Sequence, residues 1–258
     1  MFEALKYQTL LYLDTETTPI TKSYFDLTDE YKAAWLYHCK QNKLIDTNFA
    51  ETGSFSEISN MLNTLWSKQA SLVPEFSQII CTSIGEYSMD ENKNISFKTW
   101  TRFLKNSDDS EKLLLLDVQK YLNVKNPKQI IAHNGKEFDY PFLIRRFIAN
   151  NIMPPKQLQI FNKKPWEVEL FDTKDIWKFG STRSASLISI CAALNVPPSK
   201  NDIDGSMVYG LYYCDDRYEN MKRIARYCSN DVRALTLVVQ KLVILDNPEI
   251  VMTEIKYV

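Results

Sequence analysis

The feature that most constrains the fold is a short apolar run, Leu10–Leu13, that ends in the acids Asp14 and Glu16. Residues 9–14 have the composition of a buried β-strand. Successive side chains of a strand point to opposite faces, so Asp14 and Glu16 point the same way. Like charges on one face repel, and carboxylate oxygens are hard ligands that suit Mg²⁺ or Mn²⁺. The stretch therefore predicts either a divalent-metal site or an acidic turn at the end of a strand.

The same Asp-x-Glu spacing occurs at Asp109 and Glu111, where the flanking residues are polar. Spacing alone is a weak signal, because a chain with 32 acidic residues contains about one such pair by chance. We interpret 106–112 as a solvated helix start with Ser and Asp caps. The two patterns differ in context, since Asp14 and Glu16 follow a strand that looks buried.

The bulk composition is that of an ordinary globular protein. With 258 residues, we expect one domain, 1–258, with an insertion. The net charge of −1 gives no overall signature of a non-specific nucleic-acid binder, although a groove can be basic locally. The five cysteines include no C-x-x-C pair, so we expect reduced thiols that mostly fill the core. Only two histidines are present, which makes a His-rich zinc site unexpected.

The sequence carries no sign of a membrane or export segment. Its start lacks a charged region followed by an apolar one, so we expect no signal peptide. No apolar run approaches the roughly 18 residues of a membrane span. These observations and the scattered thiols predict a cytoplasmic protein without a membrane partner.

Strand and helix patterns alternate along the chain. The predicted strands are 9–14, 78–87, 95–103, 129–132 and 167–171, and the predicted helices are 28–41, 55–69, 110–122, 139–150 and the chain after about 173. A polar turn at 89–94 would join the second and third strands as a hairpin. This order predicts an α/β fold with a mixed five-stranded sheet, helices on both faces, and a helical insertion at 28–70 after the first strand.

A second acidic motif follows the predicted strand 129–132. Asn134 and Gly135 begin a turn, and Asp139 opens the next helix with Pro141 in its first turn. The ends of sheet strands are where α/β proteins place ligands, so Asp139 is a candidate site residue. The alternative is that Asp139 only caps the helix. We interpret Asp172, which also precedes a helical stretch, as a cap.

A third motif lies on a long amphipathic helix, where Tyr227 and Asp231 are one turn apart and border the apolar stripe. The stripe comprises Ile224, Cys228, Val232, Leu235, Val238, Val239 and Leu242. A pair of this kind can be a site or simply a buried hydrogen bond. Tyr212 and Asp216 have the same spacing, but they lie at the Tyr-rich end of one helix, where Asp215 and Asp216 read as a solvated turn or cap.

Three motifs follow one another along the chain: Asp-x-Glu at 14–16, Asn-x-x-x-Phe-Asp at 134–139 and Tyr-x-x-x-Asp at 227–231. Their combination is more specific than any one of them. The chain resembles the DEDDy 3′–5′ exonucleases with a ribonuclease H-like fold, and looks closest to the proofreading domain of family-B DNA polymerases. The resemblance covers residues 8 to 242. The chain is too short to carry a polymerase, so we expect a stand-alone enzyme. The insertion at 28–70 departs from a compact exonuclease core.

The resemblance implies roles for five residues. Four acids, Asp14, Glu16, Asp139 and Asp231, would hold two Mg²⁺ or Mn²⁺ ions that stabilise the attacking and leaving oxygens of a phosphodiester. Asp14 would bridge both ions. Glu16 and Asp231 would complete the site that activates the nucleophile, and Asp139 would hold the second ion. Tyr227 would orient the attacking water, because a free Tyr has a pKa near 10 and is a poor base.

The same resemblance implies that the substrate is a single-stranded or frayed DNA 3′ end, as in proofreading or DNA repair. Thr15, Asn134 and Phe138 are the candidate substrate-binding residues. Phe138 would stack on a base or be an ordinary core residue, and Asn134 would contact the sugar–phosphate backbone or cap its turn. Three alternatives remain: an RNA 3′-end trimmer, a catalytically silent binding module of the same fold, and a structural adaptor whose acids are solvated.

Overall fold

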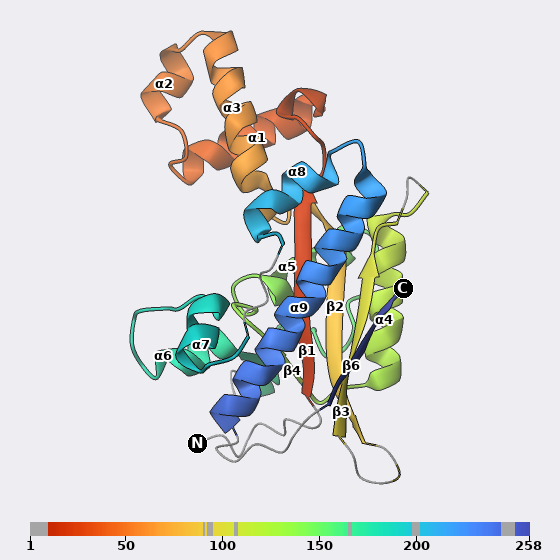
Figure 1. Ribbon diagram of the computed structural model, residues 1–258. Coiled ribbons are helices and arrows are strands. Elements are labelled where there is room, and N and C mark those ends of the chain that lie inside the picture. Colours follow the sequence, from red (N-terminus) through yellow and green to blue (C-terminus); the bar gives the residue numbers. More distant parts are fainter. Residues whose placement is uncertain are drawn as a thin grey trace.

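The core of the molecule is a mixed six-stranded sheet with the strand order β5-β4-β1-β2-β3-β6 (Figure 1). The computed structural model describes residues 10–89, 91, 95–105, 108–164, 167–197, 202–243 and 251–258. The strands are β1 (Leu10–Pro19), β2 (Ser77–Met89), β3 (Ile95–Phe103), β4 (Gln129–Ala132), β5 (Leu170–Asp172) and β6 (Val251–Tyr257). β1, β2 and β3 pair antiparallel, whereas β1–β4, β4–β5 and β3–β6 are parallel pairs. The predicted fold class is confirmed.

The strand count, however, was predicted one too low. We expected only helix after residue 173, but β6 lies at the edge of the sheet beside β3. The signal was present, because Val251, Thr253, Ile255 and Tyr257 alternate with other residues at the period of a strand. Thr9 and most of the predicted turn at 89–94 lie outside the described residues.

The helices cover both faces of the sheet (Figure 1). They are α1 (Asp29–Gln41), α2 (Thr47–Thr52), α3 (Phe55–Gln69), α4 (Glu111–Lys125), α5 (Asp139–Ala149), α6 (Thr173–Lys178), α7 (Leu187–Ala193), α8 (Val208–Tyr212) and α9 (Arg217–Val243), with short 3₁₀ helices at Tyr24–Asp26, Ala70–Leu72 and Gly205–Met207. Leu10 and Tyr12 of β1 pack with Val232 of α9. Leu11 and Leu13, on the other face, belong to a cluster that contains the core residues of α4 and α5.

Gly85 of β2 allows α9 to approach the sheet closely. A Cβ atom at this position would lie 2.7 Å from Val232 of α9, and closer still to Phe97 of β3. Contacts this short do not occur between real atoms, so only glycine fits without a shift of the helix. The close approach matters because α9 carries Tyr227 and Asp231.

The segment between β1 and β2 forms helices with a core of their own, beyond the end of β1 (Figure 1). Trp35 and Trp66 meet edge to face with ring centroids 5.2 Å apart, and Phe76 lies 5.0 Å from Trp35. Both indole N–H groups donate to backbone oxygens, Trp35 to Leu62 and Trp66 to Thr21. These contacts give the insertion a hydrophobic cluster of its own, distinct from the main cluster of the sheet.

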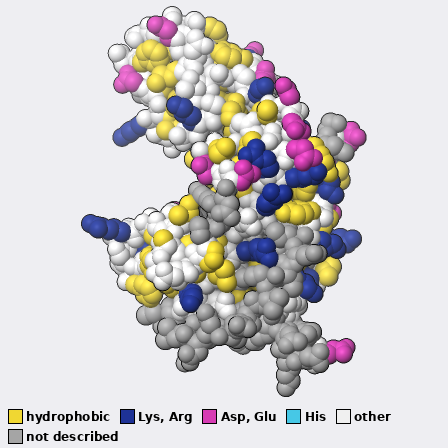
Figure 2. Space-filling model, in the orientation of Figure 1, with side chains coloured by type: hydrophobic (Ala, Val, Ile, Leu, Met, Phe, Trp, Pro, Cys, Tyr) yellow, Lys and Arg dark blue, Asp and Glu magenta, His cyan; other side chains and the backbone are white. Residues whose placement is uncertain are grey.

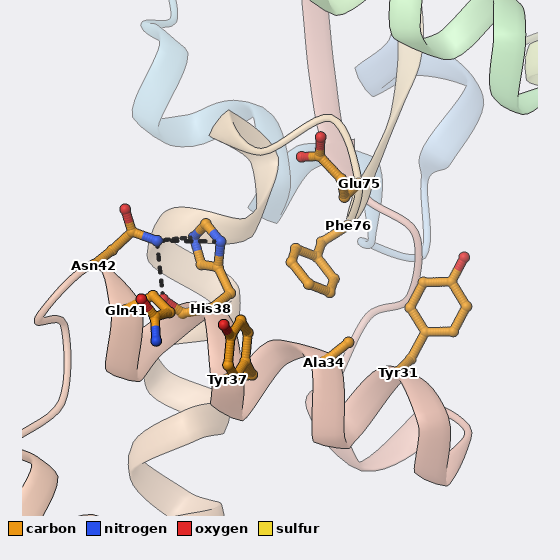
Figure 3. A pocket seen from close by; sticks show the side chains of 8 residues that line it. All are labelled: Tyr31, Ala34, Tyr37, His38, Gln41, Asn42, Glu75 and Phe76. Atoms are coloured by element: carbon orange, nitrogen blue, oxygen red, sulfur yellow. Dashed lines mark hydrogen bonds between the residues drawn. The ribbon is translucent and has the colours of Figure 1, made fainter.

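A pocket of about 520 Å³ opens on the surface of α1 (Figure 3). Its lining residues are Tyr31, Ala34, Tyr37, His38, Gln41, Asn42, Glu75 and Phe76. The imidazole of His38 lies flat against Trp35, with centroids 5.3 Å apart, and its pKa is lowered by burial. The four predicted metal-binding acids are absent from this lining, so the pocket is separate from the candidate site.

The interpretation of Asp109 and Glu111 as solvated is wrong. Their side chains are only 9% and 7% exposed. Asp109 accepts two hydrogen bonds of 2.7 Å from the Arg102 guanidinium. Glu111 accepts two from Arg146, and a third from the backbone amide of Ile79. Each acid therefore belongs to a buried ion pair that stabilises the fold. The predicted cap is confirmed, since Ser110 accepts from the amide of Leu113.

Candidate functional site

The site begins where the apolar part of β1 ends. Leu10 and Tyr12 lie under α9, and the period of two places Asp14 and Glu16 on the same face. Asp14 is opposite Ser83 in β2, and Glu16 is opposite Cys81. The register shifts directly after Glu16, as in a β-bulge. Bulges re-aim side chains, and this one follows the two acids immediately.

Helix α9 carries the third motif over these acids. The Cys228 thiol donates to the backbone oxygen of Asp14 at 3.4 Å, which ties α9 to β1 at this point. One ligand atom from each of Asp14, Glu16 and Cys228 lies within 4.8 Å of the other two. Cys228 was predicted only as part of the apolar stripe. Its position next to Tyr227 in the sequence was the signal that it would lie at the site.

Asp139 reaches the site from the other face of β1. It is the first residue of α5 and is 3% exposed. Its Oδ1 accepts from the backbone amide of Thr15 at 3.0 Å and from the Thr15 hydroxyl at 2.8 Å. Phe138 is the capping residue and makes no side-chain cap bond, so Asp139 does not play the capping role considered as its alternative. Thr15 holds Asp139, and substrate contact by Thr15 stays a prediction.

The four acids form one electrostatic group, which we call the carboxylate cage: Asp14, Glu16, Asp139 and Asp231. Burial raises the pKa of Asp14 well above its usual range, and the charges of Asp231, Glu16 and Asp139 raise it further. Burial also raises the pKa of Asp139 to about 7, against the hydrogen bonds from Thr15 that favour its charged form. Such mutual repulsion is relieved by a cation among the acids.

The donor set of the cage fits a hard divalent ion. Oδ2 of Asp14 is buried and has no hydrogen-bond partner among the described residues. A buried acceptor without a partner is costly, and bound metal is one of the ways in which proteins satisfy it. Carboxylate oxygens match Mg²⁺ and Mn²⁺ better than softer ions. Asp14, Glu16, Asp139 and Asp231 are thus suited to hold such ions.

Tyr227 lies close to the acids of the cage, and its hydroxyl is protonated. Burial raises its pKa above the ordinary value, and the charges of Glu16, Asp231 and Asp14 add to this. A hydrogen bond to Asp231 also favours the protonated form. Tyr227 therefore keeps its proton at neutral pH and can donate a hydrogen bond, but it cannot serve as a base.

Asp172 fixes the turn at Asn134. It caps α6 as predicted, accepting from the amide of Lys174 at 2.8 Å. It also accepts from the amides of Asn134 at 2.8 Å and Lys136 at 3.2 Å. Asn134 has a left-handed backbone with φ of 63°, and its side-chain oxygen accepts from Nζ of Lys174. Lys174 was not anticipated from the sequence, because its partner lies 40 residues away.

Phe138 lies between the turn and α5 and is half-buried. Its ring is tilted against that of Phe142 with centroids 5.1 Å apart, and it packs against the main core. One part of the ring is thus a core contact while another part is accessible. Base stacking by Phe138 and backbone contact by Asn134 stay predictions.

Comparison with known proteins identifies the family to which this fold belongs. A model of the RNase H superfamily matches residues 71–243, which is more than half of the chain. The protein belongs to the RNase H superfamily. The match includes Asp139, Tyr227 and Asp231, whereas Asp14 and Glu16 precede it. The resemblance drawn from the three motifs is confirmed at the level of family and fold.

A solved structure has a similar fold. The family B DNA polymerase from the hyperthermophilic archaeon Pyrobaculum calidifontis matches with a TM-score of 0.50 and 14% sequence identity, covering 90% of this chain. The chain spans 24% of the length of that polymerase. At this identity the likeness concerns the fold. No curated protein matches the sequence. Among the described residues, no helix is both long and apolar enough to cross a membrane.

Proposed function

We propose that this member of the RNase H superfamily is a metal-dependent 3′–5′ exonuclease that hydrolyses single-stranded or frayed DNA ends. The observation that carries the proposal is the cage. It gathers Asp14 and Glu16 of β1, Asp139 of α5 and Asp231 of α9, with a buried Asp14 oxygen that lacks a hydrogen-bond partner among the described residues. Superfamily membership supports nuclease chemistry, and the motif order supports the direction of cleavage.

The residues suggest how the work is divided. Asp14 would be shared by two ions, with Glu16 and Asp231 at one and Asp139 at the other. Two divalent ions, when bound, would stabilise the charges of the attacking and leaving oxygens and lower the pKa of a bound water. Tyr227 would position that water by a hydrogen bond while keeping its own proton. Thr15 would hold Asp139 in place through its two hydrogen bonds.

The DNA end would lie against the turn that precedes α5. The accessible part of Phe138 would stack on a base, a contact worth about 1–3 kcal/mol. Asn134, held by Asp172 and Lys174, would face the sugar–phosphate backbone. Such an activity would serve proofreading or repair. We also propose that residues 1–258 act as one exonuclease unit, since the largest apolar cluster joins β1, α4, α5 and α9.

The test uses DNA and RNA strands labelled at the 5′ end or at the 3′ end, incubated with Mg²⁺ or Mn²⁺ and with EDTA. Stepwise shortening of the 5′-labelled DNA, with immediate release of the 3′ label, is the expected result. Preferential shortening of RNA would replace the DNA substrate by RNA. Absence of cleavage with either metal on either polymer would reject the enzyme and favour a binding module.

A further inference from the structure

A second concave surface lies beside the first half of α9, where the helix passes the ends of β3 and β6. It is a pocket of about 320 Å³, and it is lined by Phe103, Lys105, Tyr218, Lys222, Arg226 and Tyr257. Three of these side chains are cations and three are aromatic, and the lining contains no acid. In Figure 2, several Lys and Arg side chains gather over this part of α9, among hydrophobic and acidic ones.

One wall of the pocket is a single face of α9. Tyr218, Lys222 and Arg226 follow each other at intervals of four residues, which places them in a row along the helix. Nζ of Lys222 lies 4.2 Å from the centre of the Tyr218 ring and 2.7 Å from Glu219. Tyr218 as a residue remains 48% exposed, so it is accessible to a flat group.

The facing wall comes from the sheet. Phe103 and Tyr257 meet edge to face with centroids 6.3 Å apart, and Tyr257 is 44% exposed. Lys105, just beyond β3, adds a charge. The backbone amide of Lys105 bonds to Asp109, but that carboxylate is already paired with Arg102 at 2.7 Å. This wall therefore combines two aromatic rings with one cation.

The combination matches the chemistry of a nucleic-acid strand. Cations meet phosphates, and exposed aromatic rings stack on bases without regard to sequence. The pocket is also linked to the cage through α9. Arg226 directly precedes Tyr227 and is turned from it by about 100° around the helix, and Asp231 lies about 7.5 Å further along the axis. A strand held in the pocket would cross α9 to reach the cage.

We propose that this pocket binds the strand being degraded at nucleotides on the 5′ side of the one in the cage, through its phosphates and one base. The proposal rests on the proposed exonuclease function, and it adds a site that holds long substrates. It predicts that the pocket contributes to affinity for a long strand and not for the shortest substrate. Free mononucleotides offer the same groups without the connection to the cage.

The experiment compares Lys222→Glu/Arg226→Glu with the matched double variant Lys120→Glu/Lys156→Glu, which makes the same charge change at exposed lysines outside this pocket. Binding of a DNA strand of about 12 nucleotides is measured by fluorescence anisotropy in EDTA over a range of salt concentrations. We expect the pocket variant to bind at least tenfold more weakly. The slope of log K against log salt should become shallower by about 1.4, because each phosphate contact with a single strand contributes about 0.7. Tyr218→Ala should weaken binding about tenfold, and Tyr218→Phe should restore it.

Cleavage of a dinucleotide distinguishes the contribution of the pocket from that of the cage, because a dinucleotide is too short to reach the pocket. The pocket variant should cleave the dinucleotide at the wild-type rate and degrade the long strand more slowly at low concentration. Equal binding of the long strand by the pocket and control variants would overturn the proposal. Absence of all cleavage would reject the exonuclease, whereas the binding comparison in EDTA would still decide the pocket.

Discussion

The backbone amide and the hydroxyl of Thr15 both donate to Oδ1 of Asp139, a residue 124 positions later in the chain. Thr15 lies between Asp14 and Glu16 and points to the opposite face of β1. One strand therefore presents two acids of the cage on one face and holds a third acid from the other. The three residues Asp14, Thr15 and Glu16 work as one unit.

Replacing Thr15 with Ala should lower both stability and activity. The hydroxyl donates to a buried carboxylate, and a hydrogen bond to a charged group contributes about 1.5–3 kcal/mol. We expect a loss of that size in the free energy of unfolding by urea, and a lower nuclease rate at saturating metal. Thr15→Ser keeps the hydroxyl and should retain most of the rate. Equal activity of the Ala and Ser variants would show that the hydroxyl is not needed to hold Asp139.

Asp14→Asn should abolish activity and at the same time stabilise the protein in EDTA. Asp14 is a carboxylate whose charge is opposed by burial and by three neighbouring acids, so its removal relieves repulsion. Asp14→Ala should be equally inactive and should remain folded. Thermal unfolding in EDTA checks the stability, with the exposed Glu51→Gln as a control for loss of one surface charge. A fully active Asp14→Ala protein would reject the site assignment.

Divalent metal should raise the unfolding temperature of the wild type, because an ion that binds only the folded state stabilises it by mass action. Mg²⁺ and Mn²⁺ titrations followed by thermal unfolding measure the effect, and EDTA should reverse it. The Asp14→Asn protein should show little or no increase. A similar increase in both proteins would mean that the ions bind elsewhere.

Tyr227→Phe should slow cleavage by on the order of 10²-fold, at the lower end of the effects of positioned proton-transfer groups. The ring is kept, so packing and metal binding should be unchanged. Single-turnover rates on a labelled strand measure the loss, and metal-dependent thermal unfolding gives the comparison. A rate close to that of the wild type would remove Tyr227 from the mechanism.

The ion pair of Asp109, which lies outside the cage, predicts how the stability of the protein depends on pH. Burial opposes the charge of Asp109, but the hydrogen bonds from Arg102 and from the amides of Lys105 and Ser110, together with the Arg102 charge, outweigh burial and lower its pKa. A lowered folded-state pKa means that the pair stabilises the protein above the unfolded value of about 3.9 and loses this effect as pH falls through the folded pKa. Asp109→Asn should therefore cost about 3 kcal/mol at pH 7. The difference between variant and wild type, measured by urea unfolding, should shrink below about pH 4. A constant difference down to pH 3 would contradict the pairing.

Local sequence patterns were sufficient to predict most helices and strands and to find the three motifs. The strand at 129–132 and the start of α5 at Asp139 follow from short-range signals, namely an apolar run, a glycine turn and a proline in the first helical turn. The stripe on α9 marked residues that are buried in the structure, such as Ile224 and Val232.

The sequence alone could not predict which residues far apart in the chain pair with each other. Arg102 and Arg146 decide that Asp109 and Glu111 are buried ion pairs, and neither partner can be recognised from spacing. The same holds for Thr15 with Asp139, which depends on how β1 and α5 meet. Strand β6 was missed for a different reason, because its alternating pattern was present and we extended the preceding helix over it.

The cage draws its ligands from β1, α5 and α9, that is, from residue 14 to residue 231. During synthesis the N-terminal part of the chain leaves the ribosome first and can begin to fold. A nascent chain that has not yet released α9 lacks Asp231 and Tyr227, and it also lacks the thiol that ties α9 to Asp14. The proposed nuclease would therefore gain its activity only after α9 has been synthesised and has packed against β1.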